Sequence, residues 1–172
     1  MRSLLPFAKT PLSASISVHA ELFQTSPENI LVEFLISGAL QNIAWPPPQV
    51  IEARADELWK QTCLEVFISH GLSAQDPYLE VNCSPNGNWN AYSFSSYRQG
   101  MTPAADITVR LKERSSQSNE ARFRLEIAST QALHVAHLGL TAAIEFTSGE
   151  KSYFALKHPA AQADFHDKNG WE

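Results

Sequence analysis

Apolar and polar residues alternate with a period of two in three consecutive runs between Thr62 and Tyr97. Such alternation is typical of β-strands, because successive side chains point to opposite faces of a sheet. The first two runs place on one side Leu64, Val66 and Ile68, then Leu79, Val81 and Cys83. Before the third run, Asn86-Gly87 readily adopts the positive φ of a tight turn. The segment therefore predicts three neighbouring antiparallel strands.

The second face of these strands is chemically mixed. It carries carboxyl groups, an amide and aromatic rings, among them Glu65, Phe67, Tyr78, Glu80 and Asn82. The third run places Tyr92 and Phe94 on one face and Trp89, Ala91 and Ser93 on the other. The outer face of a strand is usually polar and solvated, so this mixture favours a binding surface. Glu65 and Glu80 are expected to be cross-strand neighbours if the loop between them centres near Ser73.

Similar alternation predicts further strands along the rest of the chain, at residues 13–23, 30–37, 107–112, 121–128, 138–147 and 151–156. One helical turn is expected within residues 52–59 and a short helix within residues 129–134. About nine short strands at regular spacing, with few helical turns, are typical of an all-β fold. We therefore predict one domain over residues 1–172, an antiparallel β-sandwich of two sheets.

The composition is that of an ordinary globular protein: 172 residues, 44% hydrophobic and 18% charged. The net charge of −5 and the scattered basic residues argue against a nucleic-acid partner. No apolar run approaches the length of a membrane span, and the apolar part of Met1–Phe7 is too short for a signal peptide. We therefore expect a soluble, cytoplasmic protein with no membrane partner.

The two cysteines, Cys63 and Cys83, lie on strands that are expected to pair. The alternation places them on opposite faces of the sheet, whereas a disulfide needs side chains that point at each other. The sequence predicts two free thiols.

Several short blocks in this order resemble a known family. They are Leu58-Trp59, Thr62–Ile68, Tyr78–Asn82, Ser84-Pro85, Trp89, Tyr153–Pro159 and Asp164-Phe165-His166. They are similar to the DOMON-like domains related to family 9 carbohydrate-binding modules, and the two last blocks to a small bacterial branch of that group. The resemblance covers the chain from Asp56 onwards. It implies a jelly-roll type of sandwich whose ligand is a sugar or a haem.

In the sugar-binding members, two aromatic residues hold a pyranose ring between them. The resemblance implies that Trp59 supplies the first ring, and Phe165 is the best candidate for the second. The C–H face of a pyranose packs well on an aromatic ring, while polar groups around it bind the hydroxyls. Glu80 stands in a block where those modules carry a basic residue, so the ligand is expected to differ from theirs.

We predict a domain that binds a small saccharide or another polar small molecule without transforming it. The candidate ligand-binding residues are Trp59, Glu65, Glu80, Asn82, Trp89, Tyr97, Arg98, His158, Phe165 and His166. No catalytic residue, metal site or resident cofactor is predicted. His-x-x-His at His134 and His137 lacks a third ligand for zinc.

Alternatives remain open at this point. The aromatic residues could serve packing alone, which would leave a protein-interaction scaffold without a working pocket. Haem could be held by His158 and His166 together with Met101, and calcium stays undetermined. Glu65 and Glu80 could share a proton, bind a cation or hydrolyse a glycoside. They could also simply pair with basic residues, namely Arg98, Arg124 or Lys157.

Overall fold

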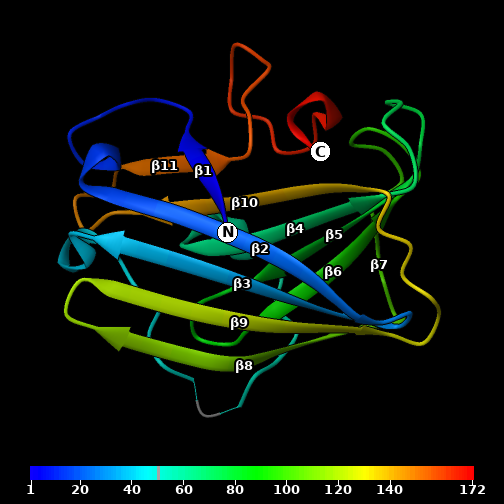
Figure 1. Cartoon of the computed structure of the whole chain (residues 1–172), viewed down its shortest axis with the longest axis horizontal. Coiled ribbons are helices and arrows are strands. Elements are labelled where there is room, and N and C mark those ends of the chain that lie inside the picture. The colour runs from blue at the N-terminus through cyan, green and yellow to red at the C-terminus, as the bar shows by residue number, and fades with distance from the viewer. Residues whose placement is uncertain (50) are drawn as a thin grey trace.

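The computed structural model of the protein describes residues 1–49 and 51–172 and contains eleven strands (Figure 1). These are β1 (Arg2–Pro6), β2 (Ile16–Ser26), β3 (Asn29–Gly38), β4 (Cys63–Ser69), β5 (Tyr78–Cys83), β6 (Trp89–Phe94), β7 (Thr102–Pro103), β8 (Ile107–Gln117), β9 (Glu120–Ser129), β10 (His137–Glu145) and β11 (Lys151–Ala155). The all-β class is as expected from the alternating pattern.

Within residues 1–49 and 51–172, helical structure is limited to four 3-10 turns, η1 (Ser13–Ser15), η2 (Leu40–Asn42), η3 (Leu58–Lys60) and η4 (Lys168–Gly170). None of the helical segments in the described residues has the length and apolarity needed to cross a membrane. The turn η3 falls at the end of the segment where a helical turn was predicted. The short helix predicted at residues 129–134 is wrong, because Ser129 ends β9 and an irregular segment follows it.

Every strand pairing between these elements is antiparallel, and together they form one continuous sheet with the order β7-β6-β5-β4-β10-β11-β1-β2-β3-β9-β8. The expected division into two separate sheets is therefore not observed. Strand β1 joins the two halves, because Arg2–Leu4 pair with β2 whereas Leu5 and Pro6 pair with β11. Strand β1 and the two-residue strand β7 were not predicted, because both are too short to show a period.

The sheet curls so that its two halves share one apolar core. We call β2, β3, β9 and β8 the open half, and β10, β4, β5 and β6 the covered half (Figure 1). Val18 and Phe34 from the open half lie in the same buried cluster as Val66 and Leu140 from the covered half. Burying apolar side chains of this size contributes about 1.5–3 kcal/mol each to the stability of the fold.

The register within the covered half confirms the predicted faces. Val66 lies opposite Val81, and Val81 lies opposite Ala91, on the face that points into the core. Cys83 also lies in this core, whereas Cys63 points to the other face and lies 3.7 Å from the Asn82 side chain. Both cysteines are buried and free, as predicted.

The C-terminal segment after β11 folds back across the outer face of the covered half. Glu172 exchanges two backbone hydrogen bonds with Leu138 on β10, at 2.7 and 3.0 Å. The ammonium of Lys168 donates to Ser69 Oγ at 3.0 Å and to the carbonyl of Asp76 at 2.8 Å, on the loop between β4 and β5. Trp171 packs on Phe67 with ring centroids 5.5 Å apart. This segment converts the outer face of the covered half into a partly enclosed site.

Candidate ligand-binding site

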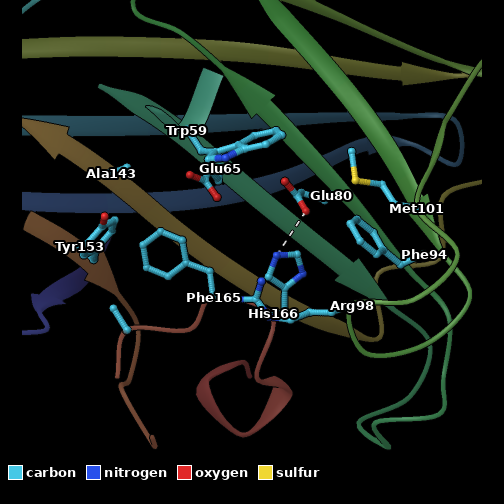
Figure 2. A pocket seen from close by; sticks show the side chains of 11 residues that line it. Trp59, Glu65, Glu80, Phe94, Arg98, Met101, Ala143, Tyr153, Phe165 and His166 are labelled. Atoms are coloured by element: carbon cyan, nitrogen blue, oxygen red, sulfur yellow. Dashed lines mark ion pairs between the residues drawn. The ribbon is translucent and has the colours of Figure 1, made fainter. Parts of the chain in front are cut away.

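A pocket of about 430 Å³ lies between the C-terminal segment and the outer face of the covered half. Its walls combine aromatic rings with three ionisable groups and an imidazole, from Trp59, Glu65, Glu80, Phe94, Arg98, Met101, Ala143, Tyr153, Ala163, Phe165 and His166. Figure 2 shows the carboxyl groups of Glu65 and Glu80 between the indole of Trp59 and the rings of Phe165 and His166.

Trp59 is held at the pocket by the loop that precedes β4. It lies in η3, a turn that begins directly after Glu57, and Glu57 adopts a left-handed conformation with φ 59°. The loop is tied to β6 because Asp56 accepts hydrogen bonds from Tyr92 Oη at 2.8 Å and from Asn90 Nδ2 at 2.9 Å. The Trp59 ring then meets Tyr92 edge to face, with centroids 6.1 Å apart. One side of the indole is thus packed, and the residue still lines the pocket.

Phe165 reaches the same pocket from the far end of the sequence. The indole N–H of Trp171 donates to the Phe165 carbonyl at 2.8 Å, which fixes the backbone that carries this ring. The indole of Trp171 lies directly against Gly139 of β10. A side chain at this position would clash with it, since a Cβ added at Gly139 would lie 2.8 Å from the indole nitrogen. The Phe165 ring meets Tyr153 of β11 edge to face at 5.9 Å. Trp59 and Phe165 therefore line one cavity although 106 positions separate them in the sequence.

Glu65 and Glu80 form the polar floor of the pocket. In the β4–β5 register Glu65 lies opposite Asn82, and Glu80 lies opposite Phe67. The two carboxyl groups are therefore diagonal cross-strand neighbours, and the loop between the strands centres between Ser73 and Ala74. Diagonal partners on one face stay within reach of long side chains.

Both carboxyl groups are buried, and the pKa of each is raised. Burial raises the pKa of Glu65 well above its usual range, and the nearby charge of Glu80 raises it further. Burial also raises the pKa of Glu80, against the opposing effects of Asn82 and Arg98. Asn82 Nδ2 donates to Glu80 Oε1 at 2.6 Å and orients that carboxyl. Two such neighbours cannot both ionise easily in a poorly solvated site, so the pair tends to keep a proton.

His166 is held as a neutral imidazole with a defined tautomer. The Tyr78 hydroxyl accepts from the Arg98 backbone N–H at 3.2 Å, so its own proton is free for His166 Nδ1 at 2.6 Å. The proton of the neutral ring then sits on Nε2, which faces Glu80 Oε2 at 3.7 Å. Burial lowers the pKa of His166 to about 4, and the positive charge of Arg98 adds to the effect. At neutral pH His166 therefore presents an N–H donor and no charge.

Arg98 is positioned by the C-terminal segment. Its guanidinium donates to Asp164 Oδ1 at 2.8 Å, and the Tyr97 hydroxyl donates to the other oxygen of the same carboxylate. The backbone N–H of His166 adds a third hydrogen bond to Asp164 at 3.0 Å. The pKa of Asp164 is lowered because these donors outweigh the effect of its burial. Arg98 thus lines the pocket as part of a neutralised pair.

Six of the ten predicted residues line the pocket: Trp59, Glu65, Glu80, Arg98, Phe165 and His166. Two more support it without lining it. Asn82 is fully buried and orients Glu80, while Tyr97 orients Asp164. The alternative in which Glu65 and Glu80 pair with Arg98, Arg124 or Lys157 is not observed among the described residues.

Two predicted residues lie elsewhere. Trp89 has the same parity on β6 as Ala91, so its ring points toward the core face and stacks against the Arg54 guanidinium at 4.3 Å. His158 binds the carbonyl of Leu5 at 2.8 Å, at the junction of β1 and β11. Trp89 and His158 therefore do not line this pocket. The alternation of β6 already contained the signal for Trp89.

Five lining residues were missing from the predicted site: Phe94, Met101, Ala143, Tyr153 and Ala163. Phe94 lies on the same face of β6 as Tyr92, as the alternation predicts, and the structure shows that this face is the outer one. Ala143 comes from β10, which pairs with β4, and Tyr153 comes from β11, which pairs with β10; both pairings join distant segments of the sequence. Nothing local in the sequence identifies them as neighbours of Glu65.

The metal and haem alternatives can be compared with this geometry. In the part of the chain that the structure describes, no group of three or more His, Cys, Asp or Glu residues is arranged to hold a metal ion. Met101 and His166 share the pocket, but His158 is bonded outside it. The three groups considered for haem are therefore not brought to one site.

Comparison with known proteins gives a likeness in fold. No protein-family model and no curated protein matches the sequence. The structure is similar to a crystal structure from Bacteroides uniformis whose carbohydrate-binding role is itself a provisional assignment, with a TM-score of 0.64 and 10% sequence identity. The match covers 99% of this chain and 83% of the other. The chain thus shares its all-β architecture with that protein.

Proposed function

We propose that this protein is a non-catalytic saccharide-binding domain and that the pocket between Trp59 and Phe165 is its binding site. The observation that carries the proposal is the convergence of these two aromatic residues on one cavity with a polar floor. The fold-level similarity to a protein with a provisional carbohydrate-binding role supports it, as does the resemblance of the sequence blocks to family 9 carbohydrate-binding modules.

The pocket has the mixed surface that a pyranose requires. Trp59, Phe165 and Tyr153 offer ring faces and edges for the C–H groups of the sugar. Glu65 and Glu80 offer acceptors, and Arg98 and His166 offer donors, which together suit hydroxyl groups that both donate and accept. A cavity of about 430 Å³ falls within the usual range of small-molecule sites.

The alternative of a scaffold that has lost its pocket is less well supported. The C-terminal segment closes over the outer face of the covered half but leaves the cavity between Trp59 and Phe165 open. Its polar floor also lacks the mutual pairing that a purely structural role favours, since Glu65 Oε1 has no hydrogen-bond partner among the described residues.

Calorimetric titration with a panel of mono- and disaccharides tests the proposal. At least one saccharide should bind, and Trp59→Ala should weaken that binding about tenfold or more, because it removes an aromatic platform worth about 1.4 kcal/mol or more. Phe23→Ala is the matched control, since Phe23 is 42% exposed on β2 of the open half. Flat isotherms across the panel, or equal losses in the two variants, would refute the assignment.

A further inference from the structure

One oxygen of the pocket floor is buried without a partner. Glu65 is 3% exposed, and its Oε1 atom makes no hydrogen bond to any residue in the ranges 1–49 and 51–172. Thr141, directly opposite on β10, is 2% exposed, and its hydroxyl is likewise unpartnered within those ranges. Buried polar atoms in folded proteins nearly always have a partner. An orphaned carboxyl oxygen in the wall of a cavity points to a ligand that donates to it.

The charges around the cavity indicate what kind of donor fits. Arg98 is already paired with Asp164, and His166 is held neutral. The other lining side chains are uncharged apart from Glu65 and Glu80. When both carboxyl groups are ionised, no other lining residue therefore compensates their negative charge. Buried charges are costly unless a counter-charge and hydrogen bonds accompany them.

The aromatic walls suit a cation as well as a sugar. Trp59, Phe94, Tyr153 and Phe165 surround the carboxyl pair, and ring faces attract ammonium groups. An ammonium carries three N–H donors and a positive charge, whereas a hydroxyl carries one O–H donor and no charge. Carboxyl oxygens with aromatic rings around them are therefore complementary to a protonated amine.

We propose that the saccharide is an amino sugar, bound with its protonated amine against Glu65 and Glu80. This inference rests on the saccharide-binding function proposed above and names the class of sugar. The ring packs between Trp59 and Phe165, and the ammonium takes the place of the proton that the carboxyl pair keeps in the absence of ligand. Binding therefore releases a proton to solvent, and affinity rises with pH for as long as the amine stays protonated.

The other titratable groups near the carboxyl pair come from six segments of the chain. They are Cys63 on β4, Tyr78 on β5, Tyr92 on β6, Tyr153 on β11, Arg98 from the loop after β6, and His166 from the C-terminal segment. Burial raises the pKa values of Cys63, Tyr78 and Tyr92, so these three stay neutral near pH 7. Glu65 and Glu80 remain the groups whose proton is exchanged for the amine.

The test is a set of calorimetric titrations of the full chain with glucosamine, glucose, N-acetylglucosamine and methylammonium. Each titration is run in two buffers of different ionisation enthalpy, which reports proton release. A charge-assisted hydrogen bond predicts that glucosamine binds about tenfold to a hundredfold more tightly than the two neutral sugars. Methylammonium, which lacks a ring to pack, should bind at least tenfold more weakly than glucosamine.

Each result has a distinct meaning. Equal binding of glucosamine and glucose, or no proton release with glucosamine, would overturn the amino-sugar inference and leave the saccharide-binding function standing. Failure of all three sugars to bind would overturn both. Methylammonium binding as tightly as glucosamine would also overturn both, because the ring would then contribute nothing.

Single substitutions test which carboxyl group causes the preference for glucosamine over glucose. Glu65→Gln keeps the shape of the side chain and should abolish the preference for glucosamine over glucose. Glu33→Gln, on β3 of the open half, is the matched control and should keep the full preference. Glu80→Gln provides a second test if Glu65→Gln does not fold, as checked by circular dichroism. An unchanged preference in a folded Glu65→Gln or Glu80→Gln protein would contradict the inference.

Discussion

The outer faces of the two halves of the sheet place charged residues in opposite ways. On the open half, Glu33 of β3 accepts from Arg124 Nε at 2.7 Å and lies 3.6 Å from Arg122, and these side chains remain partly in water. On the covered half, Glu65 and Glu80 occupy equivalent outward positions of β4 and β5, yet both are buried. The difference arises from the C-terminal segment, which covers one half and leaves the other open.

The same alternation of apolar and polar residues therefore produces a solvated outer face on the open half and a buried, ionisable outer face on the covered half. The charges of the open half neutralise one another, as in an ordinary solvated sheet surface. The covered half retains a carboxyl pair whose pKa values are raised by burial, at a cost in stability. Perturbed titratable groups that line a cavity are typical of functional sites.

The largest effect is expected from removing the cover. Trp171 is 5% exposed and holds both Phe67 and the Phe165 carbonyl. Trp171→Ala should lower the free energy of unfolding by about 3–5 kcal/mol, as for other buried aromatic truncations. Denaturant unfolding measures this loss. Phe23→Ala on the open half should cost less than about 1 kcal/mol, and similar losses in the two variants would contradict the proposed role of the cover.

A smaller effect is expected in how the stability of the fold depends on pH below neutrality. The pKa of His166 is lowered to about 4 by burial and by Arg98, whereas the unfolded chain protonates this residue near pH 6.5. Between these values the unfolded state binds more protons, so this residue lowers stability as the pH falls, by up to about 3 kcal/mol. His166→Gln should remove that component of the pH dependence. Unfolding curves of the two proteins that stay parallel from pH 7 to pH 4 would rule it out.

The smallest effect compares one substitution in both halves. Because the folded-state pKa of Glu65 is raised, the folded protein keeps a proton that the unfolded chain loses, and stability falls as the pH rises above about 4.5. Glu65→Gln removes this cost and should stabilise the protein at pH 7 by about 1–2 kcal/mol. Glu33→Gln should instead destabilise it by about 0.5–1 kcal/mol, because it removes the carboxylate charge that Arg124 and Arg122 share.

Thermal unfolding of the two glutamine variants at pH 5 and pH 7 checks these signs. The gain from Glu65→Gln should grow with pH. A loss of stability in both variants would show that Glu65 is paired in solution and that the two halves are alike.

The sequence predicts the faces of the central strands well, and the reason is local. Alternation in Cys63–Ser69 and Tyr78–Cys83 places each side chain on one of two faces, and the structure has the same assignment. The sequence predicted Glu65 and Glu80 only as cross-strand neighbours, because loop length alone does not fix which residues lie directly opposite each other. Glu65 therefore faces Asn82 instead of Glu80.

The site was predicted only in part, because it depends on contacts between distant segments. The tail around Phe165 and His166 has no period that could place it, and its position depends on Lys168 and Trp171. Tyr153 enters the pocket through the pairing of β11 with β10. The continuity of the sheet depends on β1, a five-residue strand that divides its pairing between two partners.

The most direct measurement is a crystal structure of the protein with a hexose that binds in calorimetry. The account predicts the sugar ring between Trp59 and Phe165, with its polar substituents within hydrogen-bond distance of the Glu65 and Glu80 carboxyl oxygens. A hexose bound elsewhere on the molecule, with this pocket free of sugar at a saturating concentration, would contradict it.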